Sequence, residues 1–259
     1  MIRFKNLGSG STGNATVVQA RSGTGISHLL VDCGLGIREL DKRLGAAGML
    51  AEQVDAIFIT HEHGDHIGCA RTLALRERIP VWMSEGTYAA LDRPDFGGML
   101  RIAFDGEPIE LGPMRVQPFT VPHDAREPLQ LTCTDGDARL GVVTDLGHAS
   151  AHVMRQLVDC GTLLLECNHD EALLAASSYP PFLKRRVSGA YGHLANSAAA
   201  ALAKSLLAAG KLRQVMAAHL SEQNNRPELA RQALADALGW SSEDILVANA
   251  GRGGDWLTA

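Results

Sequence analysis

Cysteine is scarce in this chain, and it never occurs in the paired spacing of a structural zinc site. Five cysteines are scattered along the 259 residues, and no two of them form a Cys-x-x-Cys pair. An odd number without paired spacing argues against both a disulfide framework and a cysteine zinc site. We therefore expect reduced thiols in the core of a cytosolic protein.

The chain also lacks long apolar runs and a general excess of basic residues. No run is long enough to cross a membrane, and residues 1–6 lack the apolar segment of a signal peptide, so we expect a cytoplasmic protein without membrane attachment. The formal net charge of −5 argues against a broadly basic nucleic-acid-coating protein, but leaves room for a local basic channel. With three Trp and three Tyr, any base-stacking platform must be small.

Short apolar runs bounded by turns alternate with helical stretches over most of the chain. We expect strands at residues 16–19, 29–32, 54–60, 79–84, 114–121, 129–134, 139–144, 162–166, 214–219 and 245–248. We expect helices at residues 38–47, 66–78, 85–91, 148–158, 197–209 and 227–238. The β-rich middle is flanked by alternating elements without repeats or linkers, which predicts one α/β domain over residues 1–259.

The most informative segment is the hexapeptide His61-Glu62-His63-Gly64-Asp65-His66, which directly follows a predicted strand. In an extended segment His61 and His63 point the same way, and Glu62 points to the other side. If a helix begins near Asp65, the carboxylate of Asp65 and the ring of His66 face back toward the same point. Imidazole nitrogens and carboxylate oxygens suit Zn²⁺, Mn²⁺ or Fe, so this loop predicts half of a two-metal site.

Three further candidate ligands each follow a predicted strand, where side chains converge at one edge of a sheet. These are His123, Asp145 and His219. We expect His61, His63 and His123 to hold one metal, and Asp65, His66 and His219 to hold the second. Asp145 has two oxygens and is expected to bridge the metals, with capping of a following helix as its structural alternative.

Taken together, these residues resemble the metallo-β-lactamase fold. The resemblance implies an α/β fold with a four-layer αββα sandwich, in which two mixed β-sheets are flanked by helices and two divalent metals lie along one edge. Asp32, in the segment LVDCG, matches an aspartate that lies near the metals without ligating them. The segments NLGSGSTGN (6–14), GHLAN (192–196) and HLSEQNN (219–225) are similar to the YycJ (WalJ, VicX) group, phosphodiesterases related to tRNase Z.

Within that group a histidine ahead of the last metal ligand donates a proton to the leaving oxygen. The resemblance places His193 in this role, although Ala195 stands where the group has serine. Glu166 ends a predicted strand and is expected to pair with His193 and tune it. Asp65, besides ligating a metal, is expected to orient the attacking water.

Small polar residues in two loops are candidate substrate contacts. Ser9, Ser11 and Asn14 lie in a glycine-rich loop that can offer backbone N–H groups to an anion, or is simply a tight turn between strands. Ser221 and Asn225 are expected to contact substrate phosphate, with orientation of His219 or capping of the helix at residue 227 as equal alternatives.

We therefore expect a binuclear metal-dependent hydrolase, a phosphodiesterase or nuclease that cleaves DNA or RNA by metal-bound hydroxide. The alternative is a hydrolase of a small non-nucleotide ester, lactone or thioester. A binding protein with a vestigial site would lack ligands, and here none is missing. Residues 146–218 are too few for an inserted cap domain and show no obvious protruding arm, which favours a small open cleft for strand ends or flexible single strands.

Overall fold

The computed structural model describes residues 1–249, 251 and 253–259, and the chain divides into two compact units. Unit 1 comprises Met1–Thr120, Ala125–Arg139 and Asn249–Ala259, and unit 2 comprises Val121–Asp124 and Leu140–Ala248. The expected single domain over residues 1–259 stays a prediction. Among the described residues, no helix combines the length and apolar character needed to span a bilayer.

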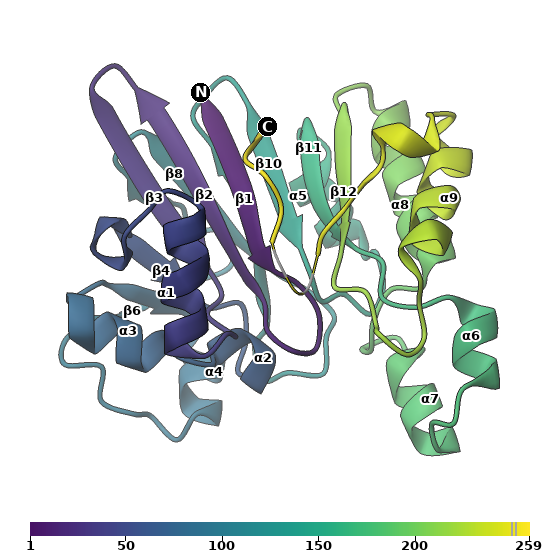
Figure 1. Cartoon of the computed structure of the whole chain (residues 1–259), viewed down its shortest axis with the longest axis horizontal. Helices are drawn as coiled ribbons and strands as arrows, with labels where there is room; N and C mark the ends of the chain where they lie inside the picture. Colours follow the sequence, from purple (N-terminus) through teal and green to yellow (C-terminus); the bar gives the residue numbers. More distant parts are fainter. Residues whose placement is uncertain (250, 252) are drawn as a thin grey trace. The chain divides into compact units, whose positions relative to one another are not determined.

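Unit 1 contains a seven-stranded mixed sheet with strand order β14-β1-β2-β3-β4-β5-β6 (Figure 1). Antiparallel pairing joins β14 through β3, and parallel pairing joins β3 through β6. The strands are β1 (Ile2–Gly8), β2 (Ala15–Ser22), β3 (Gly25–Val31), β4 (Ala56–Phe58), β5 (Val81–Met83), β6 (Leu100–Ile102) and β14 (Leu257–Thr258). The helices of this unit are α1 (Ile37–Ala46), α2 (Gly64–Ile67), α3 (Ala70–Glu77) and α4 (Glu85–Ala90), with a 3₁₀ turn at Ala51–Gln53.

The second sheet is also mixed, with strand order β13-β12-β11-β10-β9-β8-β7. Its antiparallel strands are β7 (Ile109–Leu111), β8 (Met114–Thr120) and β9 (Leu129–Thr134), and its parallel strands are β10 (Arg139–Val143), β11 (Thr162–Glu166), β12 (Gln214–Ala218) and β13 (Leu246–Val247). The helices of unit 2 are α5 (Ala151–Leu157), α6 (Glu171–Ala176), α7 (Pro181–Val187), α8 (Asn196–Ala208) and α9 (Pro227–Leu238), with a 3₁₀ turn at Ser242–Asp244. Two mixed β-sheets flanked by helices confirm the expected fold class.

Burial explains why the parallel strands of unit 2 are so apolar. All five residues of β11 are buried, as expected for a central strand of a parallel sheet. The alanine-rich helix α8 buries small residues and leucines, and α9 begins with Pro227 in its first turn and ends at Gly239 in the left-handed region (φ 68°). Figure 1 shows α8 and α9 side by side, and α6 and α7 at the end of the unit where β11 ends.

The continuous helix expected over residues 66–78 is wrong, because the chain forms α2 and α3 with a break between them. Gly68 has φ 27°, and a Cβ there would lie 2.4 Å from the carbonyl oxygen of Cys33. Only glycine permits this close approach, which lets the chain turn between the two helices. The helices α6 and α7 and the strands β1, β6, β7 and β14 were not anticipated from the sequence.

Gly34 is the position where unit 1 has least room. A Cβ at this residue would lie 1.6 Å from the carbonyl oxygen of Asp65, and the Gly34 N–H donates to the carbonyl of Asn14 (2.8 Å). Two loops that are distant in sequence therefore meet at this glycine.

We expect Gly34→Ala to lower the free energy of unfolding by about 3 kcal/mol, because the added methyl group forces these loops apart. Urea unfolding followed by circular dichroism measures the change. Gly36→Ala is the matched control, since a Cβ at Gly36 meets nothing within 4 Å. Equal stability of the two variants would contradict the close packing at Gly34.

Candidate active site

In unit 1 the candidate ligands lie where two neighbouring parallel strands end. β3 and β4 pair in parallel, so Asp32 and Thr60, which follow them, lie at the same edge of the sheet. The buried Asp32, in the left-handed region at φ 61°, accepts hydrogen bonds at Oδ1 from the Thr60 N–H (2.9 Å) and the Thr60 hydroxyl (3.0 Å). These bonds fix the start of the hexapeptide loop.

The same aspartate also orients His66. Asp32 Oδ2 lies 2.8 Å from Nδ1 of His66, and both side chains are buried. A hydrogen bond to Nδ1 sets the tautomer and leaves Nε2 as the electron-pair donor, which is the usual support of a metal-binding histidine. Asp65 Oδ2 is 3.6 Å from this Nε2 atom.

The other two histidines of the loop present nitrogens to one another. His61 Nε2 and His63 Nδ1 are 3.0 Å apart, and the ring centroids of His61 and His66 are 4.1 Å apart. Zn–N bonds of about 2.0–2.1 Å at tetrahedral angles would set two ligand nitrogens roughly 3.3 Å apart. The donor set and its spacing therefore fit a divalent cation. Within unit 1, the structure brings together His61, His63, Asp65 and His66 as the sequence predicted.

Glu62 points away from these nitrogens, as the alternation of an extended segment predicted. Its Oε1 accepts a hydrogen bond from the Arg126 N–H (2.7 Å), so this carboxylate has a structural role in the loop.

Asn14 lies behind Asp65. It is buried, and its N–H donates to the Asp65 carbonyl (2.8 Å) while its side-chain amide donates to Asp65 Oδ2 (3.3 Å). This favours a positioning role for Asn14 over the expected contact with substrate. Ser9 is buried and Ser11 is exposed, so of the three residues in this loop Ser11 is the most accessible to an anion.

In unit 2 the ends of three neighbouring parallel strands supply the candidate residues. Asp145 follows β10, Glu166 ends β11, and His219 follows β12. With His193, they form a group whose ligand atoms all lie within 4.8 Å of one another. The strand ends of this unit therefore bring these side chains together, and their role as metal ligands stays a prediction.

Glu166 is the centre of this group. Its Oε1 lies 2.7 Å from Nδ1 of His193, and its Oε2 accepts hydrogen bonds from the N–H groups of Leu146 (2.8 Å) and Leu194 (3.2 Å). The expected pairing of Glu166 with His193 is therefore found. Because both oxygens of Glu166 make these contacts, the carboxylate positions the His193 ring. Its bond to Nδ1 leaves the other ring nitrogen, Nε2, unused by Glu166.

Neighbouring charges shift the pKa values of His193 and Glu166 in opposite directions. Burial opposes protonation of His193, but the adjacent Glu166 and Asp145 carboxylates outweigh it and hold the pKa of His193 well above its usual value. Burial opposes ionisation of Glu166, yet His193 and His219 hold its pKa below the usual value. Both directions favour an imidazolium paired with a carboxylate, which gives His193 a proton to donate.

His123 is held in the form that a metal ligand needs. Its Nδ1 donates to the carbonyl of Gly192 (3.0 Å), and its Nε2 lies 3.7 Å from Asp145 Oδ1. Burial lowers the pKa of His123, so the ring stays neutral near pH 7 with an electron pair on Nε2.

The polar residues after His219 have structural contacts. Asn225 is buried, and its amide exchanges hydrogen bonds with the amide of Asn196 (both 2.9 Å) and donates to the Cys167 carbonyl (2.7 Å). The Ser221 hydroxyl accepts a hydrogen bond from the Asn224 N–H (3.2 Å). These contacts favour the structural alternative over substrate binding for Asn225, whereas Ser221 is still partly exposed.

Two supporting residues were missed from the sequence. Thr60 bridges Asp32 and His61, with its hydroxyl 3.0 Å from His61 Nδ1, and Asn168 donates from Nδ2 to the carbonyl of His219 (3.0 Å). Thr60 directly precedes His61 and Asn168 lies two residues after Glu166, so their positions were the available signal.

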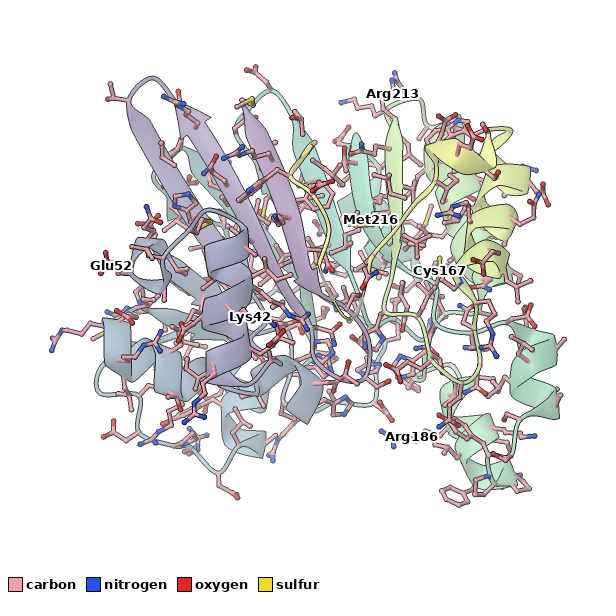
Figure 2. The ribbon with its side chains drawn as sticks, viewed as in Figure 1. Lys42, Glu52, Cys167, Arg186, Arg213 and Met216 are labelled. Atoms are coloured by element: carbon pink, nitrogen blue, oxygen red, sulfur yellow. The ribbon has the colours of Figure 1, made fainter. Side chains whose placement is uncertain are left out.

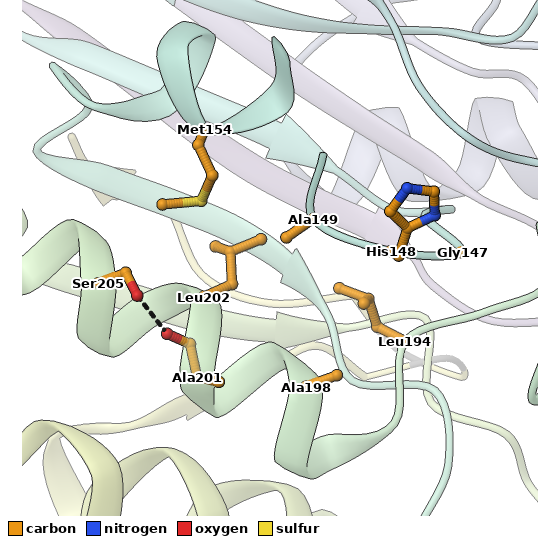
Figure 3. A pocket seen from close by; sticks show the side chains of 9 residues that line it. All are labelled: Gly147, His148, Ala149, Met154, Leu194, Ala198, Ala201, Leu202 and Ser205. Carbon is orange, nitrogen blue, oxygen red and sulfur yellow. Dashed lines mark hydrogen bonds between the residues drawn. The ribbon is translucent and has the colours of Figure 1, made fainter. Parts of the chain in front are cut away.

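Unit 2 also has a cavity of about 360 Å³, which is separate from these side chains (Figure 3). It lies between α5 and α8, and its lining includes Met154, Leu194 and Leu202. None of its lining residues is a candidate ligand, so the reactive groups lie at the strand ends and not in this cavity.

Clustered imidazoles and carboxylates at the ends of parallel strands, on two mixed sheets flanked by helices, define a metal-dependent hydrolase of the metallo-β-lactamase fold. Residues 27–219 match the family model described as the beta-lactamase superfamily domain. The fold is shared with the metallo-β-lactamase fold protein YhfI from Bacillus subtilis, at a TM-score of 0.74 and 18% identity over 98% of this chain and 100% of that one.

Two relatives identify a smaller family within this superfamily. The chain is 32% identical to exodeoxyribonuclease YycJ of Bacillus anthracis over 92% of this chain and 89% of the relative. It is 30% identical to exodeoxyribonuclease WalJ of Streptococcus pneumoniae over 91% of this chain and 88% of the relative. The chain therefore belongs to the beta-lactamase superfamily and, within it, to the family of YycJ and WalJ. This membership confirms the expected class, a metal-dependent hydrolase of the nuclease or phosphodiesterase type.

We expect Asp32→Asn to weaken binding of Zn²⁺ or Mn²⁺ about 10- to 100-fold, because an amide is a poorer acceptor for His66 Nδ1 and no longer fixes the ring. Isothermal titration of the metal-free protein measures this loss. Asp55→Asn is the control, because Asp55 also lies beside a histidine, His28, but at an exposed position. Unchanged metal affinity in Asp32→Asn would show that His66 needs no such support.

We expect Glu166→Gln to move the basic limb of the pH–rate profile to lower pH. The Glu166 carboxylate raises the pKa of His193, so its neutral replacement lowers that pKa and the proton donor is lost at a lower pH. Phosphodiesterase rates measured across the pH range test this, with Glu171→Gln on α6 as the control. A basic limb that stays in place would exclude His193 as the donor.

Proposed function

We propose that this chain is a metal-dependent exonuclease that cleaves phosphodiester bonds at the ends of DNA. The YycJ and WalJ relatives, which match about nine-tenths of this chain, are named exodeoxyribonucleases. The single observation that carries the proposal is the proton donor: His193 is held by Glu166 beside Asp145. A poor leaving group such as a sugar alkoxide needs a donated proton, which favours a phosphodiester over a small activated ester.

The proposed cofactors are two divalent metal ions, Zn²⁺ or Mn²⁺. We assign to them His61, His63, Asp65 and His66 of unit 1, and His123, Asp145 and His219 of unit 2. The neutral imidazoles and the carboxylates form the donor set that such ions prefer. When bound, the pair of ions would neutralise phosphate charge and lower the pKa of water.

Asp65 and His193 have separate roles in the proposed reaction. Asp65, held by Asn14, is placed to orient the attacking water, since its Oδ2 has a fixed direction. His193 delivers its proton from Nε2 to the leaving oxygen and is fixed by Glu166 at Nδ1. We also propose the cytoplasm as the location, because all five cysteines are buried thiols that fit a reducing compartment.

Substitution of one metal ligand and of the proton donor separates these roles. We expect His61→Ala to lose both bound metal and activity. His193→Ala is expected to keep its metal and to lose about 10²–10⁴-fold in rate. The measurements are metal analysis and turnover of bis-p-nitrophenyl phosphate and end-labelled oligonucleotides with Mn²⁺ or Zn²⁺. His152→Ala on α5 is the control.

Two results would overturn the proposal. A wild-type protein that binds metal but leaves both substrates intact would exclude a phosphodiesterase. Full activity in His193→Ala would remove this residue from catalysis while leaving the metal assignment standing.

A further inference from the structure

Positive charge in this acidic chain is concentrated in one stretch. Residues 172–221 contain no Asp or Glu, although the chain has 29 of them, and they contain six basic residues. These are Lys184, Arg185, Arg186, Lys204, Lys211 and Arg213. Figure 2 shows Arg186, on α7, and Arg213 at opposite ends of unit 2. The basic triplet on α7 is therefore a local feature at the end of the unit where α6 and α7 lie.

One exposed aromatic side chain, Phe182, lies on the same short helix, and a second, Tyr191, lies four residues beyond the end of the helix. Among the described large hydrophobic residues, Phe182 (66% exposed) and Tyr191 (63% exposed) are the two most exposed. Phe182, Arg185 and Arg186 have the i, i+3, i+4 spacing that places side chains on one face of a helix. We call Phe182, Arg185, Arg186 and Tyr191 the α7 face.

The hydrogen bonds of the triplet show which of its charges face outward. Lys184 Nζ donates to the carbonyl of Ala175 (2.6 Å), so this residue ties α7 to α6. Arg186 pairs with Asp124 (2.5 Å) and is 59% exposed. Arg185 is exposed, and within residues 1–249, 251 and 253–259 its guanidinium makes no hydrogen bond or ion pair. Arg185 therefore has five N–H donors available to a ligand.

The backbone of α7 is hydrogen-bonded directly to His193, the proposed proton donor. The carbonyl of Val187, the last residue of α7, accepts a hydrogen bond from the His193 N–H (2.8 Å). Gly192 fits so closely beneath the helix that a Cβ there would lie 2.1 Å from the Arg186 carbonyl oxygen. A ligand on the α7 face would therefore be bound within a few residues of His193.

We infer that the α7 face binds a single-stranded segment of the nucleic-acid substrate, with phosphates on Arg185 and Arg186 and unstacked bases against Phe182 and Tyr191. This inference rests on the proposed function, because the α7 face would be the surface on which the proposed exonuclease binds its substrate strand. Guanidinium groups beside exposed aromatic rings match the backbone and bases of a single strand, whereas paired bases are not free to stack on a side chain. Anionic lipid is the competing ligand, but its acyl chains would need a longer apolar face than this seven-residue helix provides.

Binding of a short fluorescent oligothymidylate, followed by anisotropy across a salt series without metal, tests the inference independently of catalysis. We expect Phe182→Ala to weaken binding by about fivefold or more, since fivefold is the lower end of the range for loss of one stacked base. We expect Arg185→Gln to reduce the slope of log affinity against log salt by about 0.7, since one phosphate contact is lost. Phe104→Ala, an exposed phenylalanine of unit 1, and Arg213→Gln are the matched controls.

Unchanged binding in Phe182→Ala and Arg185→Gln, or equal losses in their controls, would overturn the inference. Tighter binding to phosphatidylglycerol vesicles than to the oligonucleotide would also overturn it. Turnover of bis-p-nitrophenyl phosphate is expected to stay at the wild-type rate in the two control variants, Phe104→Ala and Arg213→Gln. A wild-type protein that binds the oligonucleotide but cleaves neither substrate would leave the α7 face standing and exclude the proposed function.

Discussion

A hydrogen bond between a histidine Nδ1 and a buried carboxylate organises the candidate residues within each of the two units. Asp32 holds His66 in unit 1, and Glu166 holds His193 in unit 2. A buried carboxylate is costly unless its oxygens are satisfied, and each one accepts backbone N–H groups from neighbouring loops. The carboxylates therefore fix the loops and the rings together.

The two carboxylates produce different chemistry from the same contact. His66 lies beside His61 and His63, so its Nε2 belongs to a cluster of nitrogens suited to a cation. His193 lies beside two carboxylates, Glu166 and Asp145, which together stabilise its protonated form. Neighbouring charge, and not residue type, thus separates the proposed metal ligand His66 from the proposed proton donor His193.

The sequence revealed those parts of the site that depend on local spacing. The loop from His61 to His66 follows a strand and enters a helix, and period-two alternation was enough to orient its side chains. The contact of Asn14 with Asp65 was not anticipated because Asp65 lies far away in sequence, and the break at Gly68 depends on the carbonyl of Cys33. The helices α6 and α7 have six and seven residues, too few for a periodic pattern to stand out from a loop.

The net charge of the whole chain does not indicate the charge of a binding surface as small as the α7 face. Charges interact strongly only within a Debye length of about 8–10 Å, so a phosphate on α7 senses Arg185 and Arg186 far more than distant acidic residues. Few contacts also suit an enzyme that shortens a strand from its end, because the product must leave and the strand must advance after each cut. A tight clamp would oppose that movement. A single helix whose last carbonyl holds the backbone of His193 can instead position the strand end and release it.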